Sequence, residues 1–399
     1  MANLPWITII GLGEDGPEGL PPASRDALAA AEIIMGPARH LALIGPTNAQ
    51  QVEWPVPFAD GIDVLRGHGG RPVAVLVSGD PFWYGAGRAM SKAFGRDAWR
   101  AIPVPSVFSL VSSRMGWPIE DTLCIGLHAR PFEQLRAKLA PGRRIIATLR
   151  DGPAVSGVAH FLRDTGFGGS TLTVCEAVGG PREVVTQVSV AEALKGGFSH
   201  PVTVAVELHG TGEVIPLASG RPDALFQTDG VMTKRPVRAL TLSALAPRAG
   251  EHLWDIGGGS GSIAVEWALA DRTCTATVVE TRADRVALIR ANVESFGLTD
   301  QVTVLEGMAP GAMADAPPAN AVFIGGGLSP EMLQFVTALP KGTRVVANAV
   351  TLEAEAHLAQ AQGSFGGDLM RIEIAHAQPL GPKRGWTSAY PVVQWSVTL

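Results

Sequence analysis

Short apolar runs rich in β-branched residues recur along the whole chain, and helix-like segments separate them. The runs of the first half are WITIIGLG, PVAVLVSGD, RRIIATLRD, STLTVCEA and PVTVAVEL. Those of the second half are HLWDIGGG, CTATVVE, QVTVLEG, NAVFIGG and TRVVANAV. Runs of this length and composition are typical of strands buried inside α/β sheets. The sequence therefore predicts an α/β protein throughout, with helices such as GAGRAMSKAF and SGVAHFLRDTG between the strands.

One stretch near the middle of the chain, residues 207–230, interrupts this alternation. Its sequence, ELHGTGEVIPLASGRPDALFQTDG, is rich in turn residues and has no helical or strand periodicity of useful length. At 399 residues the chain is also longer than one ordinary domain. We therefore predict two domains, residues 1–210 and 229–399, joined by a linker at 211–228.

The composition excludes several classes of function. Hydrophobic residues make up 46% of the chain and the net charge is −5, so a large core can form and neither half has the basic excess of a nucleic-acid binder. No apolar stretch is long enough for a membrane helix, and the N-terminus has no secretory pattern. Cys124, Cys175 and Cys274 lack the spacing of a metal site, and no His/Cys cluster suits one, so we expect buried thiols, no metal and a cytoplasmic protein that binds a small molecule.

The loop after the first predicted strand contains three glycines, Gly11, Gly13 and Gly16, in the G-x-G-x-x-G spacing of a dinucleotide site. That site needs a helix at the third glycine, but Pro17 and further prolines follow. A helix becomes plausible only from Ser24 as N-cap, over RDALAAAEIIM. These glycines are therefore interpreted as part of a long loop, not as a pyrophosphate turn.

A more specific glycine turn lies in the second half, in HLWDIGGGSGSIAVEWALA. A strand ends at Asp255, glycines follow in D-x-G-x-G-x-G spacing, and a helix begins at once, so a ligand can lie against the open backbone turn. The next predicted strand ends in Glu280, about twenty residues further on, where an acid accepts hydrogen bonds from ribose hydroxyls. NAD binding is the alternative that this pattern leaves open.

Together these features resemble the class I S-adenosylmethionine-dependent methyltransferases. TKRPVRALTLSAL, EGMAP, VFIGGG and VVANAVTLEAE narrow the resemblance to cobalamin-pathway methyltransferase domains that methylate C15 of a corrin precursor and decarboxylate its ring-C acetate. The resemblance implies a Rossmann-like domain whose S-adenosylmethionine site contains Thr233, Gly257, Gly258, Gly259, Ser260, Gly261, Glu280 and Ala309.

Three basic residues near the start of this domain, Lys234, Arg235 and Arg238, are candidate contacts for substrate carboxylates. Pro236 suits the first turn of a helix, and Arg235 and Arg238 would then share a face. The alternative is an ordinary solvated helix start.

The first half resembles the tetrapyrrole methylases, in the branch that methylates C5 of the same precursor. The resemblance rests on GLGEDGPEGL, VLVSGDPFWYGAG, VPSVFSLVSSRMGWP, GLHARP and VCEAVGGPREVV, in that order. It implies a two-lobed α/β fold with S-adenosylmethionine in the cleft, held by Gly13, Gly79, Asp80, Trp83, Ser109 and Ala177. Arg39 and Arg130, with their neighbours His40 and His128, are candidate substrate contacts. The family's usual G-x-G-P-G loop is altered here, since Glu14 and Asp15 replace Pro-Gly.

The two resemblances together imply an enzyme that methylates a precorrin at C5 and C15 and decarboxylates it, with S-adenosylmethionine as methyl donor. The expected partners are this tetrapyrrole and further copies of the chain in a homo-oligomer. Catalytic residues stay unassigned, because aligned methyl transfer needs no strong general base. The alternative is that one half is a degenerate macrocycle-binding module and that only one methylation is catalysed.

Overall fold

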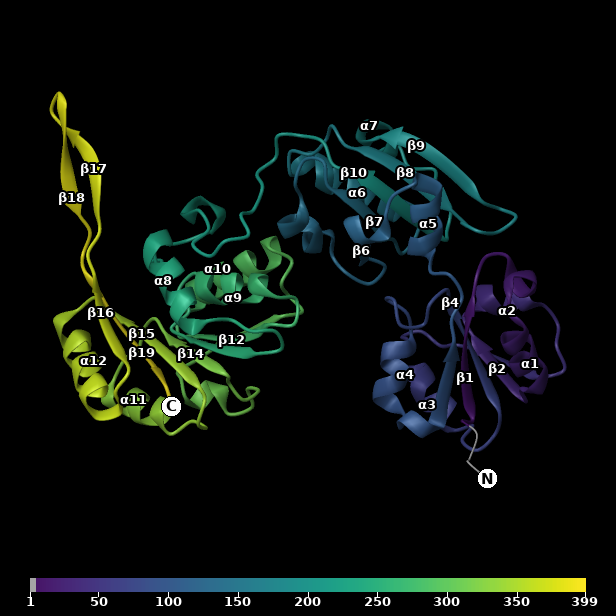
Figure 1. Ribbon diagram of the computed structural model, residues 1–399, viewed down its shortest axis with the longest axis horizontal. Helices are drawn as coiled ribbons and strands as arrows, with labels where there is room; N and C mark the ends of the chain where they lie inside the picture. The colour runs from purple at the N-terminus through teal and green to yellow at the C-terminus, as the bar shows by residue number, and fades with distance from the viewer. Residues whose placement is uncertain (1–4) are drawn as a thin grey trace. The chain divides into compact units, whose positions relative to one another are not determined.

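The computed structural model describes residues 5–399, which form two compact units (Figure 1). Unit 1 contains the described residues up to Phe132 together with Ala140–Glu213. Unit 2 contains Val214–Leu399 and the short segment Glu133–Leu139. In the described chain, no helix is long and apolar enough to cross a membrane. The mixed α/β fold is the class that the sequence predicts.

Lobe A of unit 1, which ends with β5, is a five-stranded parallel sheet in the order β3-β2-β4-β1-β5. Its strands are β1 (Ile7–Leu12), β2 (Ile33–Gly36), β3 (Gln50–Glu53), β4 (Val73–Ser78) and β5 (Trp99–Ile102). Helices α1 (Pro22–Ala30) and α2 (Ala38–Ile44) cover one face of the sheet, and α3 (Asp60–Arg66) and α4 (Gly87–Ala93) cover the other. From β1 the chain continues to β2, toward one edge of the sheet, and from β4 it continues to β5, toward the opposite edge. The strand order therefore reverses between the neighbours β1 and β4. Ligands of open α/β sheets bind at the carboxyl ends of such strands.

Lobe B of unit 1 is a five-stranded sheet in the order β6-β7-β10-β8-β9. β6 and β7 are parallel, whereas the other neighbouring pairs are antiparallel. The strands are β6 (Leu123–Gly126), β7 (Arg144–Thr148), β8 (Thr171–Glu176), β9 (Val184–Ser189) and β10 (Val202–Glu207). The helices are α5 (Val107–Met115), α6 (Pro153–Asp164) and α7 (Val190–Ala193).

Unit 2 has a seven-stranded sheet in the order β13-β12-β11-β14-β15-β19-β16. The first five strands in this order are parallel, and β19 and β16 complete the sheet in antiparallel pairs. The strands are β11 (His252–Ile256), β12 (Thr275–Glu280), β13 (Val302–Glu306), β14 (Ala321–Ile324), β15 (Arg344–Ala349), β16 (Asp368–Ile372) and β19 (Val392–Thr398). The order reverses between β11 and β14, which marks the carboxyl ends of these strands as the place for a ligand.

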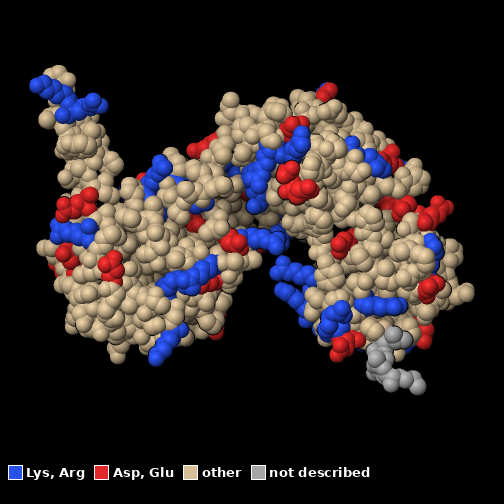
Figure 2. Space-filling model, in the orientation of Figure 1, with Lys and Arg blue, Asp and Glu red and all other residues tan. Residues whose placement is uncertain are grey.

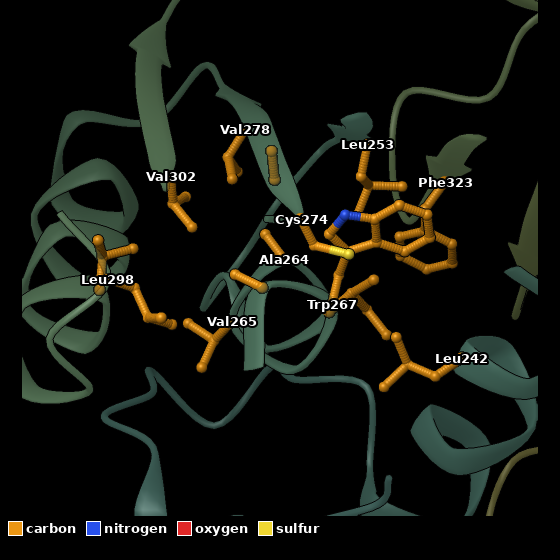
Figure 3. Close-up of a cluster of buried hydrophobic side chains, with 14 of the residues drawn as sticks. Leu242, Leu253, Ala264, Val265, Trp267, Cys274, Val278, Leu298, Val302 and Phe323 are labelled. Carbon is orange, nitrogen blue, oxygen red and sulfur yellow. The ribbon is translucent and has the colours of Figure 1, made fainter. Parts of the chain in front are cut away.

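Helices cover both faces of this sheet (Figure 1). One face carries α8 (Arg235–Leu245), α9 (Ser262–Ala270) and α10 (Ala283–Ser295), and the other carries α11 (Pro330–Thr337) and α12 (Leu352–Phe365). Trp267 lies in α9, and its indole packs beside Leu253, Cys274 and Phe323 in a buried hydrophobic cluster (Figure 3). Cys274 is a buried free thiol, which explains this cysteine as part of the core.

A hairpin of β17 (Ala375–Leu380) and β18 (Lys383–Ser388) projects from the sheet of unit 2 (Figure 1). Nearly all of its residues are exposed, including the large apolar side chains of Leu380 and Trp386. Its tip is basic, as Figure 2 shows. No pattern in the sequence predicts this hairpin.

Two local expectations differ from the structure. The helix predicted over RDALAAAEIIM ends at Ala30, and Ile33–Gly36 forms the fully buried strand β2 instead. Ser24 is not the N-cap either, because Pro21 occupies that position and Ser24 lies buried within the first turns. The apolar run Ile-Ile-Met continues a helical pattern, but burial on both faces of a parallel sheet favours the strand.

The stretch expected to be the linker divides between the units. Residues from Val214 onward belong to unit 2, where Ile215 and Phe226 are buried in its core. A short 3₁₀ turn, Asp223–Leu225, precedes the second of these side chains. The domain limits 1–210 and 229–399 therefore stay a prediction, while the compact packing of unit 2 begins earlier in the chain than residue 229.

Candidate active sites

The glycine turn of unit 2 follows β11 at the reversal point between β11 and β14. Gly257 and Gly259 have φ angles of +71° and +59°, a region that favours glycine. A Cβ on Gly257 would lie 2.7 Å from the backbone nitrogen of Gly326, in the loop after β14. A Cβ on Gly259 would meet only the carbonyl oxygen of Val231, at 3.8 Å. The turn is thus tightly packed behind Gly257 and open in front of Gly259.

Glu280, at the end of β12, reaches this turn. One carboxylate oxygen accepts a hydrogen bond from the backbone nitrogen of Gly259 at 3.0 Å. The other oxygen accepts from the backbone nitrogens of Thr281 and Arg282 at 2.9 and 3.1 Å. The residue is buried, so these contacts hold the carboxylate beside the turn.

Two further polar groups at the turn have no hydrogen-bond partner among residues 5–399, namely Oδ1 of Asp255 and Oγ of Ser260. Burial, with a smaller contribution from the charge of nearby Glu280, raises the pKa of Asp255 to about 7, although the hydrogen bond from the backbone of Ala264 opposes this shift. Unpartnered buried polar atoms are uncommon in folded proteins and mark a place where a ligand or water completes the contacts.

The segment 228–233 passes close to the turn through Val231. Asp229 anchors it to α10 through an ion pair with Arg285 at 2.9 Å, and Thr233 anchors it to α8 because its carbonyl oxygen accepts a hydrogen bond from Arg238 at 2.5 Å. Ala309 follows β13, in the loop whose Gly307 donates a backbone hydrogen bond to the carbonyl oxygen of Glu280. The predicted residues Thr233, Gly257 to Gly261, Glu280 and Ala309 therefore all lie in segments that meet or adjoin the glycine turn.

The expectation that Arg238 contacts a substrate disagrees with its surroundings. Its side chain is completely buried, and it donates to Glu266 at 2.7 Å and to Asp223 at 3.0 Å. Arg238 lies in the predicted helix, which has Pro236 in its first turn, but its side chain is directed into unit 2. Lys234 and Arg235 are exposed and stay candidates.

The site of unit 1 is a cavity of about 870 Å³ at the carboxyl ends of β1 and β4. Gly13, Gly79, Asp80, Trp83 and Arg39 line it, as do residues from lobe B. A Cβ on Gly11 would lie 2.0 Å from the carbonyl oxygen of Gly79, so the ends of the two strands are in close contact.

Aromatic side chains form one wall of this cavity. Trp83 stacks on Phe108 with the ring centroids 5.3 Å apart, and the hydroxyl of Tyr84 donates to the carbonyl oxygen of Cys124 at 3.2 Å. Trp83 and Tyr84 are each more than a third exposed, although they line the cavity. The wall therefore offers ring faces to a ligand.

Polar residues of α2 and β4 form a second wall. Nη2 of Arg39 donates to Nε2 of His40 at 2.7 Å and to Oγ of Ser78 at 3.1 Å. Burial, assisted by the charge of Arg39, lowers the pKa of His40 to about 4. Burial also lowers the pKa of His128 and of His200, so these three cavity histidines are neutral at pH 7.

Three predicted residues do not line the cavity. Ser109 lies in the first turn of α5, where its backbone nitrogen donates to the N-cap Ser106. Ala177 and Arg130 are each next to residues that do line it. Four residues of the cavity were not predicted as candidates from the sequence: Ser78, Tyr84, His200 and Glu14, although the altered loop that contains Glu14 was noted. The signal for Ser78 and Tyr84 was present in SGDPFWYGAG, whereas His200 has none. Metal-ligand groupings of three or more His, Cys, Asp or Glu are absent among the described residues.

Comparisons with known proteins agree with this division of the chain. Residues 7–194 match the family described as Tetrapyrrole (Corrin/Porphyrin) Methylases, and residues 224–399 match one described as Precorrin methyltransferase domain. The chain is 44% identical to a "Precorrin-6Y C(5,15)-methyltransferase [decarboxylating]" from Sinorhizobium sp, over 99% of this chain and 96% of that protein. It is 38% identical to a protein of the same name from Mycobacterium tuberculosis, over 98% and 99% of the two chains.

A solved structure, the C-terminal domain of precorrin-6Y C5,15-methyltransferase from Rhodobacter capsulatus, is 50% identical with a TM-score of 0.45, and covers 46% of this chain and 100% of that chain. Because the two relatives match this chain over almost their whole length, the chain belongs to the precorrin-6Y C(5,15)-methyltransferase (decarboxylating) family and is a methyltransferase of cobalamin biosynthesis.

Proposed function

We propose that this chain uses S-adenosylmethionine to methylate precorrin-6B (also called 6Y) at C5 in unit 1 and at C15 in unit 2. Unit 2 would also decarboxylate the ring-C acetate, so that the product is precorrin-8. The observation that carries the proposal is that each unit has a reversal of strand order with glycines at the carboxyl ends of its strands, where a ligand could bind. The name shared by the two relatives, which covers both methylations and the decarboxylation, supports it.

The residues of unit 2 fit S-adenosylmethionine. The space in front of Gly259 leaves room for a ligand against the backbone, and the unpartnered oxygens of Asp255 and Ser260 offer hydrogen bonds. Gly257 to Gly261, Glu280, Thr233 and Ala309 would hold the molecule, with the Glu280 carboxylate on its ribose. S-adenosylmethionine would supply an activated methyl group there.

The cavity of unit 1 fits a flat macrocycle and a cofactor by its lining. Trp83 and Tyr84 present aromatic faces, and Arg39 presents a guanidinium suited to a carboxylate. Gly13, Gly79 and Asp80 bring the ends of β1 and β4 close to the ligand. Ser109, Ala177 and Arg130 do not line the cavity, and the proposal includes them only as residues next to its lining.

The work of these residues is mainly alignment. The meso carbons of a reduced tetrapyrrole are enamine-like nucleophiles, and the chain's task is to hold the reacting carbon in line with the methyl group. Such positioning can supply roughly 7–11 kcal/mol of the barrier. Neutral His40, His128 and His200 leave the cavity without a cationic imidazole at pH 7, which suits a reaction that needs no strong acid. For decarboxylation, unit 2 would desolvate the acetate.

The test is the product that the whole chain makes from precorrin-6B with ¹³C-methyl S-adenosylmethionine. We expect mass spectrometry to find two added methyl groups and the loss of one carbon dioxide, and NMR to place the labels at C5 and C15. A product with a single methyl group would favour the alternative, in which one unit only binds the macrocycle. The full-length similarity to relatives named for both positions does not favour that alternative.

We also propose that the chain forms a homo-oligomer through the β17–β18 hairpin. Exposed strand edges with apolar side chains are templates for pairing, and a second copy offers an identical hairpin. Trp386 and Leu380 are 79% and 69% exposed in the single chain. Trp386→Ser should lower the mass measured by sedimentation equilibrium, whereas an unchanged mass would contradict the role of the hairpin.

A further inference from the structure

The carboxylate of Glu14 joins two arginines at the cavity of unit 1. One oxygen forms an ion pair with Nη1 of Arg39, and the other pairs with Nη2 of Arg182 at 3.1 Å. The Glu14 side chain is only 9% exposed, and both Glu14 and Arg39 line the cavity. Each carboxylate oxygen thus has its own guanidinium, which is the arrangement of a carboxylate-binding site that is already filled.

The partners of Glu14 come from different parts of unit 1. Arg39 lies in the first turn of α2 in lobe A, whereas Arg182 lies in the loop between β8 and β9 in lobe B. This loop can approach Glu14 because Gly180 has no side chain, and a Cβ there would lie 2.5 Å from Cβ of Glu14. Removing Glu14 would leave two cations facing one another across this contact.

The surroundings of Arg39 are electropositive. Burial and, to a lesser extent, the charge of Arg182 lower its pKa to about 10, so Arg39 is still a cation at pH 7. Its second amino group is directed to neutral acceptors, His40 and Ser78. In the local network of Arg39, Arg182, His40 and Ser78, the negative charge comes from Glu14.

We infer that Arg39 and Arg182 bind a carboxylate of the ligand in unit 1, and that Glu14 occupies this site as an internal carboxylate until the ligand displaces it. The inference rests on the proposed function, because that function supplies a ligand with carboxylates. Exchange of one carboxylate for another conserves the ion pairs. Glu14 and Asp15 replace the usual Pro-Gly of the loop that follows β1. The strength of the two ion pairs of Glu14 then sets how strongly a ligand carboxylate must compete for the arginines.

Two ligands in this cavity would carry a carboxylate: the precorrin, through its acetate and propionate side chains, and S-adenosylmethionine, through its methionine end. The chemistry recognised is the same. Separate Michaelis constants for the two ligands distinguish them, because only the one whose carboxylate displaces Glu14 will respond to a change at that residue.

The experiment compares Glu14→Gln with the wild type in the full chain, with C5 methylation followed by NMR of the ¹³C label. Without the competing charge, we expect the KM of one ligand to fall by roughly threefold to tenfold, as for the loss of one partly buried ionic competitor. Glu18→Gln, which removes an exposed acid from the same loop, is the matched control and should change neither KM.

Arg182→Met provides the second variant and should raise the same KM. An unchanged or higher KM for both ligands in Glu14→Gln would overturn the inference, because Glu14 would then merely hold the arginines in place. Failure of the proposed function would look different: no C5-methylated product would form with the wild type. Thermal unfolding of each variant shows whether it is folded. If Glu14→Gln fails to fold, the Arg182→Met variant decides, and an unchanged KM in that variant counts against the inference.

Discussion

Loss of the buried carboxylate of Glu266 should strongly destabilise unit 2. Glu266 lies in α9 with a completely buried side chain, and its carboxylate accepts hydrogen bonds from the backbone of Gly220 and Arg221 and from the side chains of Arg221 and Arg238. Both arginines are almost fully buried as well. Burial lowers the pKa of Arg221, and Glu266 opposes this shift by stabilising the guanidinium.

Glu266→Gln keeps the shape of the side chain but leaves these buried cations with only the partial compensation of Asp223. Breaking a buried ion pair from one side costs about 3–5 kcal/mol. Against a stability of roughly 5–15 kcal/mol for a domain, this is a large fraction. With a urea dependence of about 2 kcal/mol per molar, the midpoint for unfolding unit 2 should fall by about 2 M.

The assay is hydrogen–deuterium exchange at increasing urea, read by mass spectrometry on peptides of α9 and β11, because it reports on unit 2 separately from unit 1. Glu294→Gln is the matched control, since Glu294 is exposed on α10 and should change stability by less than about 0.5 kcal/mol. Arg238, a partner of Glu266, also donates a hydrogen bond to the carbonyl oxygen of Thr233, a residue of the proposed S-adenosylmethionine site. In Glu266→Gln, C15 methylation should therefore need more S-adenosylmethionine, while C5 methylation continues. A loss below about 1 kcal/mol in Glu266→Gln would refute the reasoning.

Three further predictions concern the two sites. Gly259→Ala should abolish C15 methylation, because the new Cβ meets open space where a ligand would lie, and should leave unit 2 folded although the positive φ costs an alanine about 1–2 kcal/mol. Gly258→Ala should destabilise unit 2 more, because its Cβ would come within 2.2 Å of a β12 side chain, and equal effects on melting and product would contradict the distinction. The raised pKa of Asp255 means that the folded state holds a proton that the unfolded state releases, so stability should fall as the pH rises from about 4 through about 7, and urea titrations of Asp255→Asn should lack this slope. Asp80→Ala should give a decarboxylated product methylated only at C15, whereas Glu280→Ala should lose C15 methylation; the same mixture from both variants, by NMR of the labelled product, would argue against two separate sites.

The predicted strands show how much of the fold can be predicted from local sequence. Every run identified by its β-branched, apolar composition contains a strand, because burial on both faces demands such residues. Other strands were not predicted: β9, β17 and β18 are largely exposed, so pairing and not composition fixes them. Exposure does not explain every omission, because β19 is largely buried and was also missed. β2 was mistaken for helix because Ile33–Gly36 is short and follows a run of alanines.

Arg238 illustrates what the sequence could not resolve and what it could have indicated. Helical spacing placed it on one face with Arg235, but spacing alone does not say whether that face meets solvent or a partner. The missed signal was Glu266, the one charged residue of the apolar helix SIAVEWALA. A buried acid needs a cation, and Arg238 and Arg221 supply it.

The two sites also differ in how much of each could be found by reading along the chain. In unit 2 the glycine turn and Glu280 lie on adjacent parallel strands, so a single spacing of about twenty residues predicts both, and the carboxylate indeed contacts the Gly259 nitrogen. In unit 1 the ends of β1 and β4 are neighbours in space but far apart in sequence, and lobe B contributes the remaining walls. Glu14, Arg39 and Arg182 therefore become a cluster only in the folded unit. In the sequence, Glu14 is only a departure from the family pattern. In the folded cluster, its carboxylate balances the charges of Arg39 and Arg182, and a ligand carboxylate must compete with it.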